Sequence, residues 1–245
     1  MLAAPSLSLG NAPVSRRTLL LPSALQIGRG TLTGAEAHHA LRVLRLSVGD
    51  EVELADGAGH RAVARVVAVA KERMDLELTE VTAVADAPAG LLTVAVAAPK
   101  GDHLSDLVRG LTELGVGRIV PLICARGERV PAQLDRLERI AAEALKQCRR
   151  GHLPGIGPAV SVDELVRSGA VLMVADRAGR GSPLGRPRAL TLVVGPEGGL
   201  TMDELAQLDA AGAQRVRLAS SILRIETAAV ALAAIFTAAW ENLDP

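Results

Sequence analysis

The expected fold is decided by a short apolar run that breaks into a glycine-rich turn: Thr191-Leu192-Val193-Val194-Gly195-Pro196-Glu197-Gly198-Gly199-Leu200-Thr201-Met202-Asp203-Glu204. The run from Leu192 to Val194 is typical of a strand that is buried on both faces. Thr201 and the later Glu204 match a capping box, which predicts that a helix begins there. A strand, a glycine-rich turn and a helix N-terminus often bind a small polar ligand in α/β domains. The turn by itself is equally compatible with a purely structural connection.

A second stretch favours the ligand-binding interpretation. It overlaps the apolar run Val216 to Leu218, leads into an alanine-rich helix ending near Trp240, and reads Leu218-Ala219-Ser220-Ser221-Ile222-Leu223-Arg224-Ile225-Glu226-Thr227-Ala228. Together the two stretches resemble the signature loops of the SPOUT methyltransferases. The combination of Gly-Pro-Glu-Gly-Gly with Ile-Leu-Arg-Ile-Glu-Thr-Ala resembles specifically the RsmE family, the 16S rRNA uracil-N3 methyltransferases. The resemblance covers nearly all of the chain from Ser15.

Composition narrows the classes of function. The chain has 245 residues, 27 basic against 27 acidic side chains and 1% aromatic residues, so stacking of successive bases on an aromatic platform is nearly excluded. Cys124 and Cys148 cannot by themselves form a disulfide framework or a zinc site, and we expect no metal. The N-terminus lacks the pattern of a secretory signal, and the longest apolar run is shorter than the ~20 residues of a membrane span. We therefore expect a cytoplasmic protein that does not enter a membrane.

The chain is long enough for two domains. Residues 1–14 are predicted to form a mobile extension, residues 15–83 a small barrel of short strands with one helix near residues 35–46, and residues 84–90 a linker. Strands and helices then alternate over residues 91–245, which predicts an α/β domain with a mainly parallel sheet. The resemblance implies a PUA-like RNA-binding domain followed by a SPOUT domain with a trefoil knot. It also implies a homodimer in which two subunits complete each active site.

Basic residues outside the glycine-rich turn are candidates for RNA binding. Those near the N-terminus form a local excess of positive charge that fits phosphate contacts, although a solvated helix face would also carry them. Lys100, Arg126 and Arg150 match positions of family motifs. A long helix is expected over residues 132–150, with Lys146 on its solvated side. A loop rich in Gly and Pro adds Arg177, Arg180, Arg186 and Arg188. The main candidates are Arg16, Arg17, His38, His39, Arg42, Arg45, Lys100, Arg126 and Arg150.

Methylation of uracil N3 needs an oriented donor and a nucleophile that has lost its proton. Transfer from S-adenosylmethionine releases a neutral thioether, so the donor needs orientation more than acid catalysis. The N3 proton must be accepted, or the imide anion must be stabilised as it forms. Arg224 is the expected catalytic residue, because it stays charged and presents several donors. Glu226 either accepts the proton, orients Arg224, or only complements the dipole of the helix that begins there.

The resemblance places the cofactor between the two loops and the end of the strand at residues 171–176. Glu197 there either contacts the adenosine side of the cofactor or stabilises the turn. The implied cofactor-binding residues are Val194, Gly195, Pro196, Glu197, Gly198, Gly199, Leu218, Ala219, Ser221, Ile222 and Leu223.

The first hypothesis is therefore an enzyme that uses S-adenosyl-L-methionine to methylate N3 of a specific uridine in 16S rRNA of the small ribosomal subunit. One alternative is another SPOUT reaction, such as methylation of the ribose 2′-oxygen. The other is a non-catalytic RNA-binding factor that assists ribosome assembly.

Overall fold

The computed structural model describes residues 17–84, 91–100, 103–128, 134–180 and 190–241. Contacts between Cα atoms divide the chain into two compact units. One holds the residues up to Asp56 together with His60–Thr82, and the other holds Gly57–Gly59 together with the residues from Ala83 onward. Arg16, Arg186 and Arg188 lie outside the described residues, as do nearly all of the predicted extension and linker.

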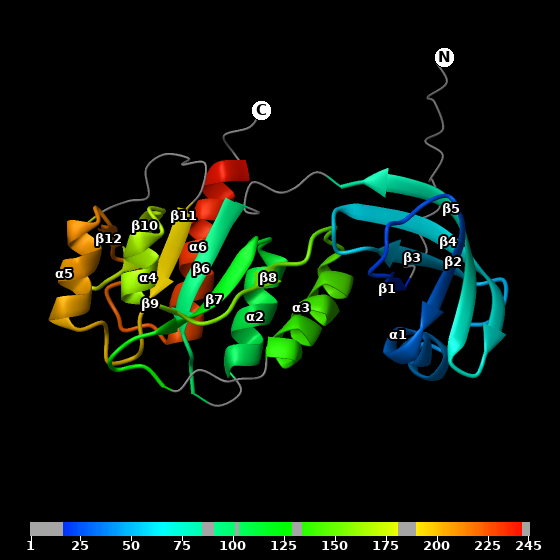
Figure 1. The fold of residues 1–245 in the computed structure, drawn as a ribbon, viewed down its shortest axis with the longest axis horizontal. Coiled ribbons are helices and arrows are strands. Elements are labelled where there is room, and N and C mark those ends of the chain that lie inside the picture. Colours follow the sequence, from blue (N-terminus) through cyan, green and yellow to red (C-terminus); the bar gives the residue numbers. More distant parts are fainter. Residues whose placement is uncertain (1–16, 85–90, 101–102, 129–133, 181–189, 242–245) are drawn as a thin grey trace, which may run out of the picture. The chain divides into compact units, whose positions relative to one another are not determined.

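The first unit is built on a five-stranded sheet that curls, with the strand order β1-β3-β4-β5-β2 (Figure 1). β1 pairs with β3 in parallel, whereas β3 pairs with β4 and β2 with β5 in antiparallel register. The elements are β1 (Thr18–Leu20), β2 (Gly28–Thr33), α1 (Gly34–His38), η1 (His39–Val43), β3 (Glu51–Ala55), β4 (His60–Ala70) and β5 (Arg73–Ala83).

Alternation along β4 fills the core of this unit. Ala62, Ala64 and Val66 are almost fully buried and pack with Leu54 and Met74 in one cluster. Because successive side chains of a strand point to opposite faces, these alternate residues of β4 share the face that packs into the core. The opposite face and the end of the strand are more open, and Val67 is exposed.

Two features of the first unit differ from the expectation. β2 was not predicted, because its Gly28-Arg29-Gly30 start looks like a turn. The single helix expected near residues 35–46 is a short α-helix that widens into the π-helical turn η1, where the Leu44 amide donates to the His39 carbonyl at 3.0 Å. Such wide turns are frequent at functional sites.

The second unit contains a seven-stranded sheet with the order β12-β10-β11-β6-β7-β8, and β9 also pairs with β7. The recorded pairs in this sheet are parallel, which confirms the predicted architecture. Its strands are β6 (Leu92–Ala97), β7 (Arg118–Ile123), β8 (Gly155–Ile156), β9 (Val160–Ser161), β10 (Val171–Ala175), β11 (Leu190–Val194) and β12 (Gln214–Val216). Its helices are α2 (His103–Glu113), α3 (Leu134–Cys148), α4 (Val162–Arg167), α5 (Met202–Ala210) and α6 (Ile225–Glu241).

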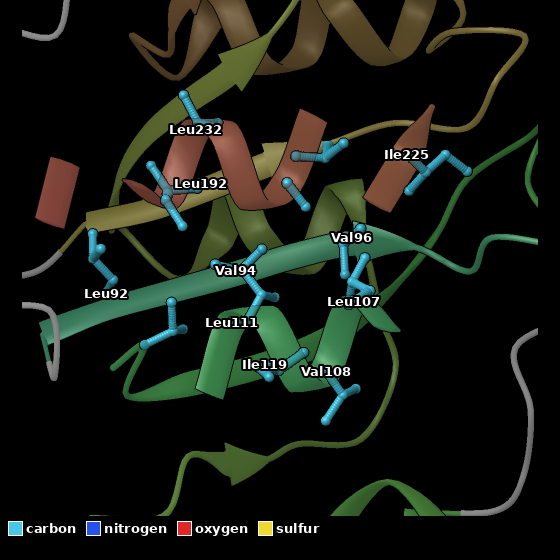
Figure 2. Packing of buried hydrophobic residues seen from close by; sticks show 14 of the residues in the cluster. Leu92, Val94, Val96, Leu107, Val108, Leu111, Ile119, Leu192, Ile225 and Leu232 are labelled. Carbon is cyan, nitrogen blue, oxygen red and sulfur yellow. The ribbon is translucent and has the colours of Figure 1, made fainter. Parts of the chain in front are cut away.

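Helices cover both faces of this sheet. Leu92, Val94 and Val96 of β6 pack with residues of α2, α3 and α6, and Figure 2 shows Val94 beside Leu111 of α2. Ala95 belongs to the opposite cluster, together with residues of α4 and α5. The strands are therefore buried on both faces, as their unbroken apolar runs predict.

One side chain of α3 contradicts the expected pattern. Lys146 was expected on the solvated side of this helix, but its side chain is only 5% exposed. Its ammonium group lies 2.8 Å from a carboxylate oxygen of Glu143, one turn earlier. A buried charge needs such a partner, and the long aliphatic stem accounts for much of the buried surface. Among the described residues, no helix is long and apolar enough to cross a membrane.

Candidate functional site

The glycine-rich turn begins where β11 ends. The Gly199 amide donates to the Pro196 carbonyl at 2.8 Å and closes the turn. Gly199 has φ +70°, a left-handed conformation that favours glycine. A Cβ atom on Gly195 would lie 2.9 Å from Cγ of Leu200, so the chain folds back on itself more tightly there than another residue would allow. These glycines leave backbone, rather than side chains, to line the space beside the turn.

The predicted capping box at the start of α5 is confirmed. The Glu204 amide donates to Oγ1 of Thr201 at 3.2 Å, and the Thr201 amide donates to Oε2 of Glu204 at 2.7 Å. The second oxygen, Oε1, accepts from the amide of Ala125 at 2.7 Å. Burial acts to raise the pKa of Glu204, but the Thr201 and Ala125 amides, the Thr201 hydroxyl and the charge of Arg126 outweigh it, and the pKa lies below its ordinary value.

The second loop follows β12 and ends at α6. The Ala228 amide donates to the Arg224 carbonyl at 2.9 Å, so Arg224 immediately precedes the helix and its carbonyl accepts the first helical hydrogen bond. The side chain of Arg224 is exposed, whereas Ile225 is buried in the core against the sheet. Ile222 is 72% exposed. The loop is therefore anchored at its end while two of its side chains reach solvent.

The two loops and the end of β10 enclose a cavity of about 300 Å³. This volume is at the small end of the range for ligand pockets, about 300–1,000 Å³. β12, β10 and β11 are neighbours in the sheet, so their carboxyl ends meet at one edge, where α/β sheets usually bind ligands. The lining residues are Ala175, Asp176, Arg177, Val194, Gly195, Pro196, Glu197, Gly198, Gly199, Leu200, Leu205, Val216, Arg217, Leu218, Ala219, Ser221, Ile222, Leu223, Ile225 and Ala228.

An arginine from β12 fixes one wall of the cavity. Nη1 of Arg215 donates to Oδ2 of Asp176 at 3.0 Å, and its Nε donates to Oδ1 of Asp209 at 2.8 Å. The hydrogen bond to Asp209, with a smaller contribution from Asp176, raises the pKa of the Arg215 guanidinium above its ordinary value. Asp176 also accepts from the Ala178 amide at 3.1 Å. Both of its carboxylate oxygens are thus engaged, and the loop after β10 is held against β12.

Two family models match the chain. The description of one is RNA methyltransferase domain, over residues 86–237, and that of the other is RNA methyltransferase PUA domain, over residues 32–79. The ribosomal RNA small subunit methyltransferase E of a Synechocystis species is 34% identical, covering 89% of this chain and 76% of the relative. The protein of the same name from Mycobacterium bovis is 32% identical, covering 85% of this chain and 87% of the relative.

The chain belongs to the ribosomal RNA small subunit methyltransferase E family.

Solved structures agree with this assignment. A ribosomal RNA small subunit methyltransferase E from Neisseria gonorrhoeae, bound to S-adenosylmethionine, superposes with a TM-score of 0.83 at 30% identity. The match covers 92% of this chain and 98% of that one. A Legionella pneumophila methyltransferase with bound S-adenosylmethionine gives a TM-score of 0.84 at 25% identity, covering 92% of this chain and 98% of that one. The SPOUT-type fold with a small preceding domain is therefore established, and the trefoil knot stays a prediction.

The structure brings all eleven predicted cofactor-binding residues of this family member to the same cavity. One is the last residue of β11, five come from the turn after it and five from the loop after β12: Val194, Gly195, Pro196, Glu197, Gly198, Gly199, Leu218, Ala219, Ser221, Ile222 and Leu223. Their role in holding the cofactor remains a prediction. Arg177 and Arg217 also line the cavity and were not predicted to belong to it. The signal that could have identified them is their position just beyond the apolar ends of two strands, because Arg217 directly follows Val216 and Arg177 lies two residues after Ala175. Ala175 and Val216 pair in the sheet.

The two predicted catalytic residues lie at the edge of the cavity. Arg224 stands between the lining residues Leu223 and Ile225, with its side chain in solvent. Glu226 is half-buried in the first turn of α6, and its Oε1 lies 3.7 Å from Nδ1 of His103 at the start of α2. This position suits a carboxylate that complements the helix dipole, and it is also within reach of a neighbouring imidazole.

The predicted RNA-binding residues of the first unit lie at its surface. Those that the structure describes are exposed or half-exposed: Arg17, His38, His39, Arg42 and Arg45. Four of them lie on α1, η1 and the residues directly after it. Arg45 ends this segment with φ +56°, a conformation that is uncommon for a side chain other than glycine. The unusual π-helical turn therefore coincides with the predicted basic surface.

The predicted RNA-binding residues of the second unit contact other parts of the protein. Nζ of Lys100 lies 3.3 Å from Oε1 of Glu128, and Nη1 of Arg126 donates to the Gly198 carbonyl at 2.9 Å. The guanidinium of Arg150 covers Gly115, and its Nε is buried without a hydrogen-bond partner among the described residues. Within that part of the chain, no group of three or more His, Cys, Asp or Glu side chains could hold a metal ion.

Proposed function

We propose that this protein transfers the methyl group of S-adenosyl-L-methionine to N3 of a specific uridine in 16S rRNA of the small ribosomal subunit. The observation that carries the proposal is the cavity at the carboxyl edge of β10, β11 and β12, which both loops of the family signature line. The relatives from Neisseria and Legionella are bound to S-adenosylmethionine and share this fold. A ribosomal substrate implies that the protein acts in the cytoplasm.

The cavity offers backbone and apolar surface for the cofactor and charged groups for the reaction. The glycines of the turn expose amides and carbonyls that suit the polar groups of a nucleoside, while Leu218, Leu223 and Val194 line the cavity with apolar surface. The bound cofactor supplies the methyl group on a sulfonium centre, and the chain has to hold that centre in line with the target nitrogen.

Arg224 is the group that we assign to the target base. Its fixed carbonyl and exposed side chain place a permanent positive charge beside the cavity, where it can stabilise negative charge on O2 or O4 as N3 loses its proton. Glu226 follows in the first turn of α6 and acts by orienting Arg224 or by accepting the proton. Its neighbour His103 is the other titratable group that the structure places beside it.

RNA binding is assigned to the first unit and to the basic residues near the cavity. The match to an RNA methyltransferase PUA domain covers residues 32–79, which include His38, His39, Arg42 and Arg45. Arginine side chains at a surface suit contacts to phosphate, which orient RNA without reading its sequence.

We also propose that two copies of the chain form the active enzyme. One face of α6 carries small or apolar residues that are exposed or half-exposed, including Ala231 and Ala234 beside Ile235. Ile222, beside the cavity, is 72% exposed. A second subunit that covered these surfaces would bury apolar area and close the site. Sedimentation equilibrium tests this, and a single species at the mass of one chain would contradict it.

The test of the activity uses small ribosomal subunits that lack the modification. Calorimetric titration with S-adenosylmethionine should give saturable heat, and nuclease digestion followed by mass spectrometry should locate the new methyl group on uracil rather than on ribose. Arg224→Ala should lower kcat about 10²–10³-fold, as expected for the loss of a donor to developing charge, and should leave the Kd of the cofactor nearly unchanged.

Three results would count against this assignment. Absence of saturable heat and of methyl transfer would exclude the enzyme. A methyl group found on ribose would indicate the other SPOUT reaction, and full activity of Arg224→Ala would remove the catalytic role of that arginine.

A further inference from the structure

Two helices of the second unit begin with the same capping box, and the two boxes differ in one contact. In α4 the Ser161 amide donates to Oε2 of Glu164 at 2.7 Å, and the Glu164 amide donates to Oγ of Ser161 at 3.2 Å. The Thr201 box of α5 has the same two distances, 2.7 and 3.2 Å. The local chemistry of the helix start is therefore satisfied in the same way in both places.

Among the described residues, the carboxylate of Glu204 accepts a hydrogen bond from a distant segment, whereas that of Glu164 does not. Oε1 of Glu204 accepts from the amide of Ala125 at 2.7 Å, across 79 positions of the sequence. Ala125 belongs to a tight turn after β7, which the Gly127 amide closes by donating to the Cys124 carbonyl at 3.0 Å. The recorded bonds of Glu164 stay within its own box. The carboxylate of Glu204 thus serves the helix with one oxygen and the turn after β7 with the other.

A second bond joins the same two segments from the opposite direction. Nη1 of Arg126 donates to the Gly198 carbonyl at 2.9 Å, so the turn after β7 holds the glycine-rich turn at its middle as well as at the helix that follows it. Gly198 lines the cavity. A turn with three glycines has many conformations available to it, and two long-range bonds reduce that freedom before a ligand binds.

The turn after β7 is itself joined to the next loop along the sheet edge. Its Glu128 lies 3.3 Å from Nζ of Lys100, which follows β6. β11, β6 and β7 are neighbours in the sheet, so the connections after three adjacent strands are linked by polar contacts at their carboxyl ends. The glycine-rich turn is therefore held by contacts from outside the β11–α5 segment to which it belongs.

We propose that Glu204 is a positioning residue for the cofactor, which acts by holding the turn after β7 against the glycine-rich turn through the Ala125 amide. The proposal rests on the proposed function, because it assumes that the cavity binds S-adenosylmethionine. With the bond in place, the backbone of residues 195–199 is preorganised for the cofactor. Without it, the turn must be ordered on binding, and cofactor affinity falls.

Glu204→Gln separates the two roles of this side chain, which are to cap α5 and to bind the Ala125 amide. Glutamine is an accepted partner in a capping box, so its carbonyl oxygen can keep the Thr201 amide. Its NH₂ group then faces the Ala125 amide, and two donors cannot form a hydrogen bond. The matched control is Glu164→Gln, which makes the same chemical change in a box without the long-range contact.

The full-length wild type and both variants are titrated with S-adenosylmethionine and assayed for methyl transfer. Glu204→Gln should raise the Kd and the KM of the cofactor about tenfold, as expected for loss of one hydrogen bond to a charged acceptor, with little change in kcat at saturation. Glu164→Gln should stay within about twofold of the wild type. Hydrogen exchange should show a faster Ala125 amide in Glu204→Gln and unchanged exchange in Glu164→Gln.

The outcomes separate this proposal from the function on which it rests. If the wild type binds no cofactor, the proposed function fails and the positioning role fails with it. If the wild type binds and Glu204→Gln binds equally well, or if Glu164→Gln weakens binding to the same extent, the positioning role alone is overturned. Faster exchange at Ala125 together with weaker binding supports it.

Discussion

Gly179 offers a sharp test of how the wall of the cavity is built. A Cβ atom at this position would lie 2.7 Å from three backbone atoms of β12, the carbonyl carbons of Arg215 and Val216 and the amide nitrogen of Val216. Carbon atoms pack at about 3.5–4.0 Å, so in Gly179→Ala the loop after β10 has to move away from β12 by roughly 1 Å. Backbone atoms of a paired strand cannot yield as the end of a flexible side chain can.

The displacement has two measurable consequences. Forcing one extra methyl group into a packed site costs about 1–3 kcal/mol, which corresponds to a fall in Tm of roughly 2–12 °C for a domain of this size. The same movement would pull Asp176 away from Arg215 and from the Val216 carbonyl, to which its amide now donates at 2.9 Å. Asp176 and Arg177 line the cavity, so the Kd of S-adenosylmethionine should also rise, by about tenfold if the shift weakens one hydrogen-bonded contact.

Calorimetric titration and thermal unfolding of the same samples measure both effects. Gly155→Ala is the control, because its Cβ atom would lie 3.9 Å from the Gly117 carbonyl oxygen, an ordinary contact. It should leave both Kd and Tm close to the wild type. If Gly179→Ala bound the cofactor with wild-type affinity, the loop after β10 would not form a wall of the binding site, and the assignment of this cavity would have to be revised.

Two further predictions concern acid stability and assembly. The folded-state pKa of Glu204 lies below its ordinary value of 4.5, so its contribution to the free energy of unfolding is complete above that pH and is lost as pH falls through the folded pKa. Urea unfolding between about pH 6 and pH 3 should therefore show a wild-type advantage over Glu204→Gln that shrinks with acidification, and an advantage independent of pH would refute the shift. Ile235→Arg places a charge on the 39%-exposed apolar position of α6 and should convert dimers to monomers in sedimentation equilibrium, whereas a stable dimer of this variant would move the interface elsewhere.

The sheet of the second unit could be predicted because its signal is local. The strand expected at residues 171–176 is β10, which ends one residue earlier at Ala175, and the alternation of strands and helices expected over residues 91–245 is observed, as in β6 followed by α2. In each case a buried strand or an apolar stripe of helical period specifies the element by itself. The start of α5 was also predictable, since a capping box needs only Thr201 and Glu204.

The first unit shows where local patterns fail. β2 starts with glycines and is recognisable only through its pairing with β5, as in the register of Leu32 with Met74. The π-helical turn η1 adds a residue to a helical turn, a change that no apolar period reveals. Lys146 is buried beside Glu143, although its spacing on α3 places it among charged residues. Tertiary packing decided all three.

In the candidate site, the residues that line the cavity could be predicted from the sequence, but the contacts that hold them could not. The eleven residues meet in one cavity because the two loops that carry them follow β11 and β12, which flank β10 in the sheet, and the sequence identified both loops. The hydrogen bonds that hold those loops could not be predicted, because their partners are far apart in the sequence. Arg215 and Asp176 are 39 positions apart, and Ala125 and Glu204 are 79 positions apart.

The signature of the family identifies the groups beside the cavity but not the contacts that hold them in place. A sequence that retains the glycine-rich turn and the arginine of the second loop contains the groups that touch a cofactor, but not necessarily the contacts that hold them. Arg126 illustrates the point, since it is predicted to bind RNA and also donates to the carbonyl of Gly198. The bond uses one of several donors, so the same guanidinium can still meet a phosphate. If it does, RNA binding and the order of the glycine-rich turn become coupled through one side chain, and each ligand must then change the affinity for the other by the same factor.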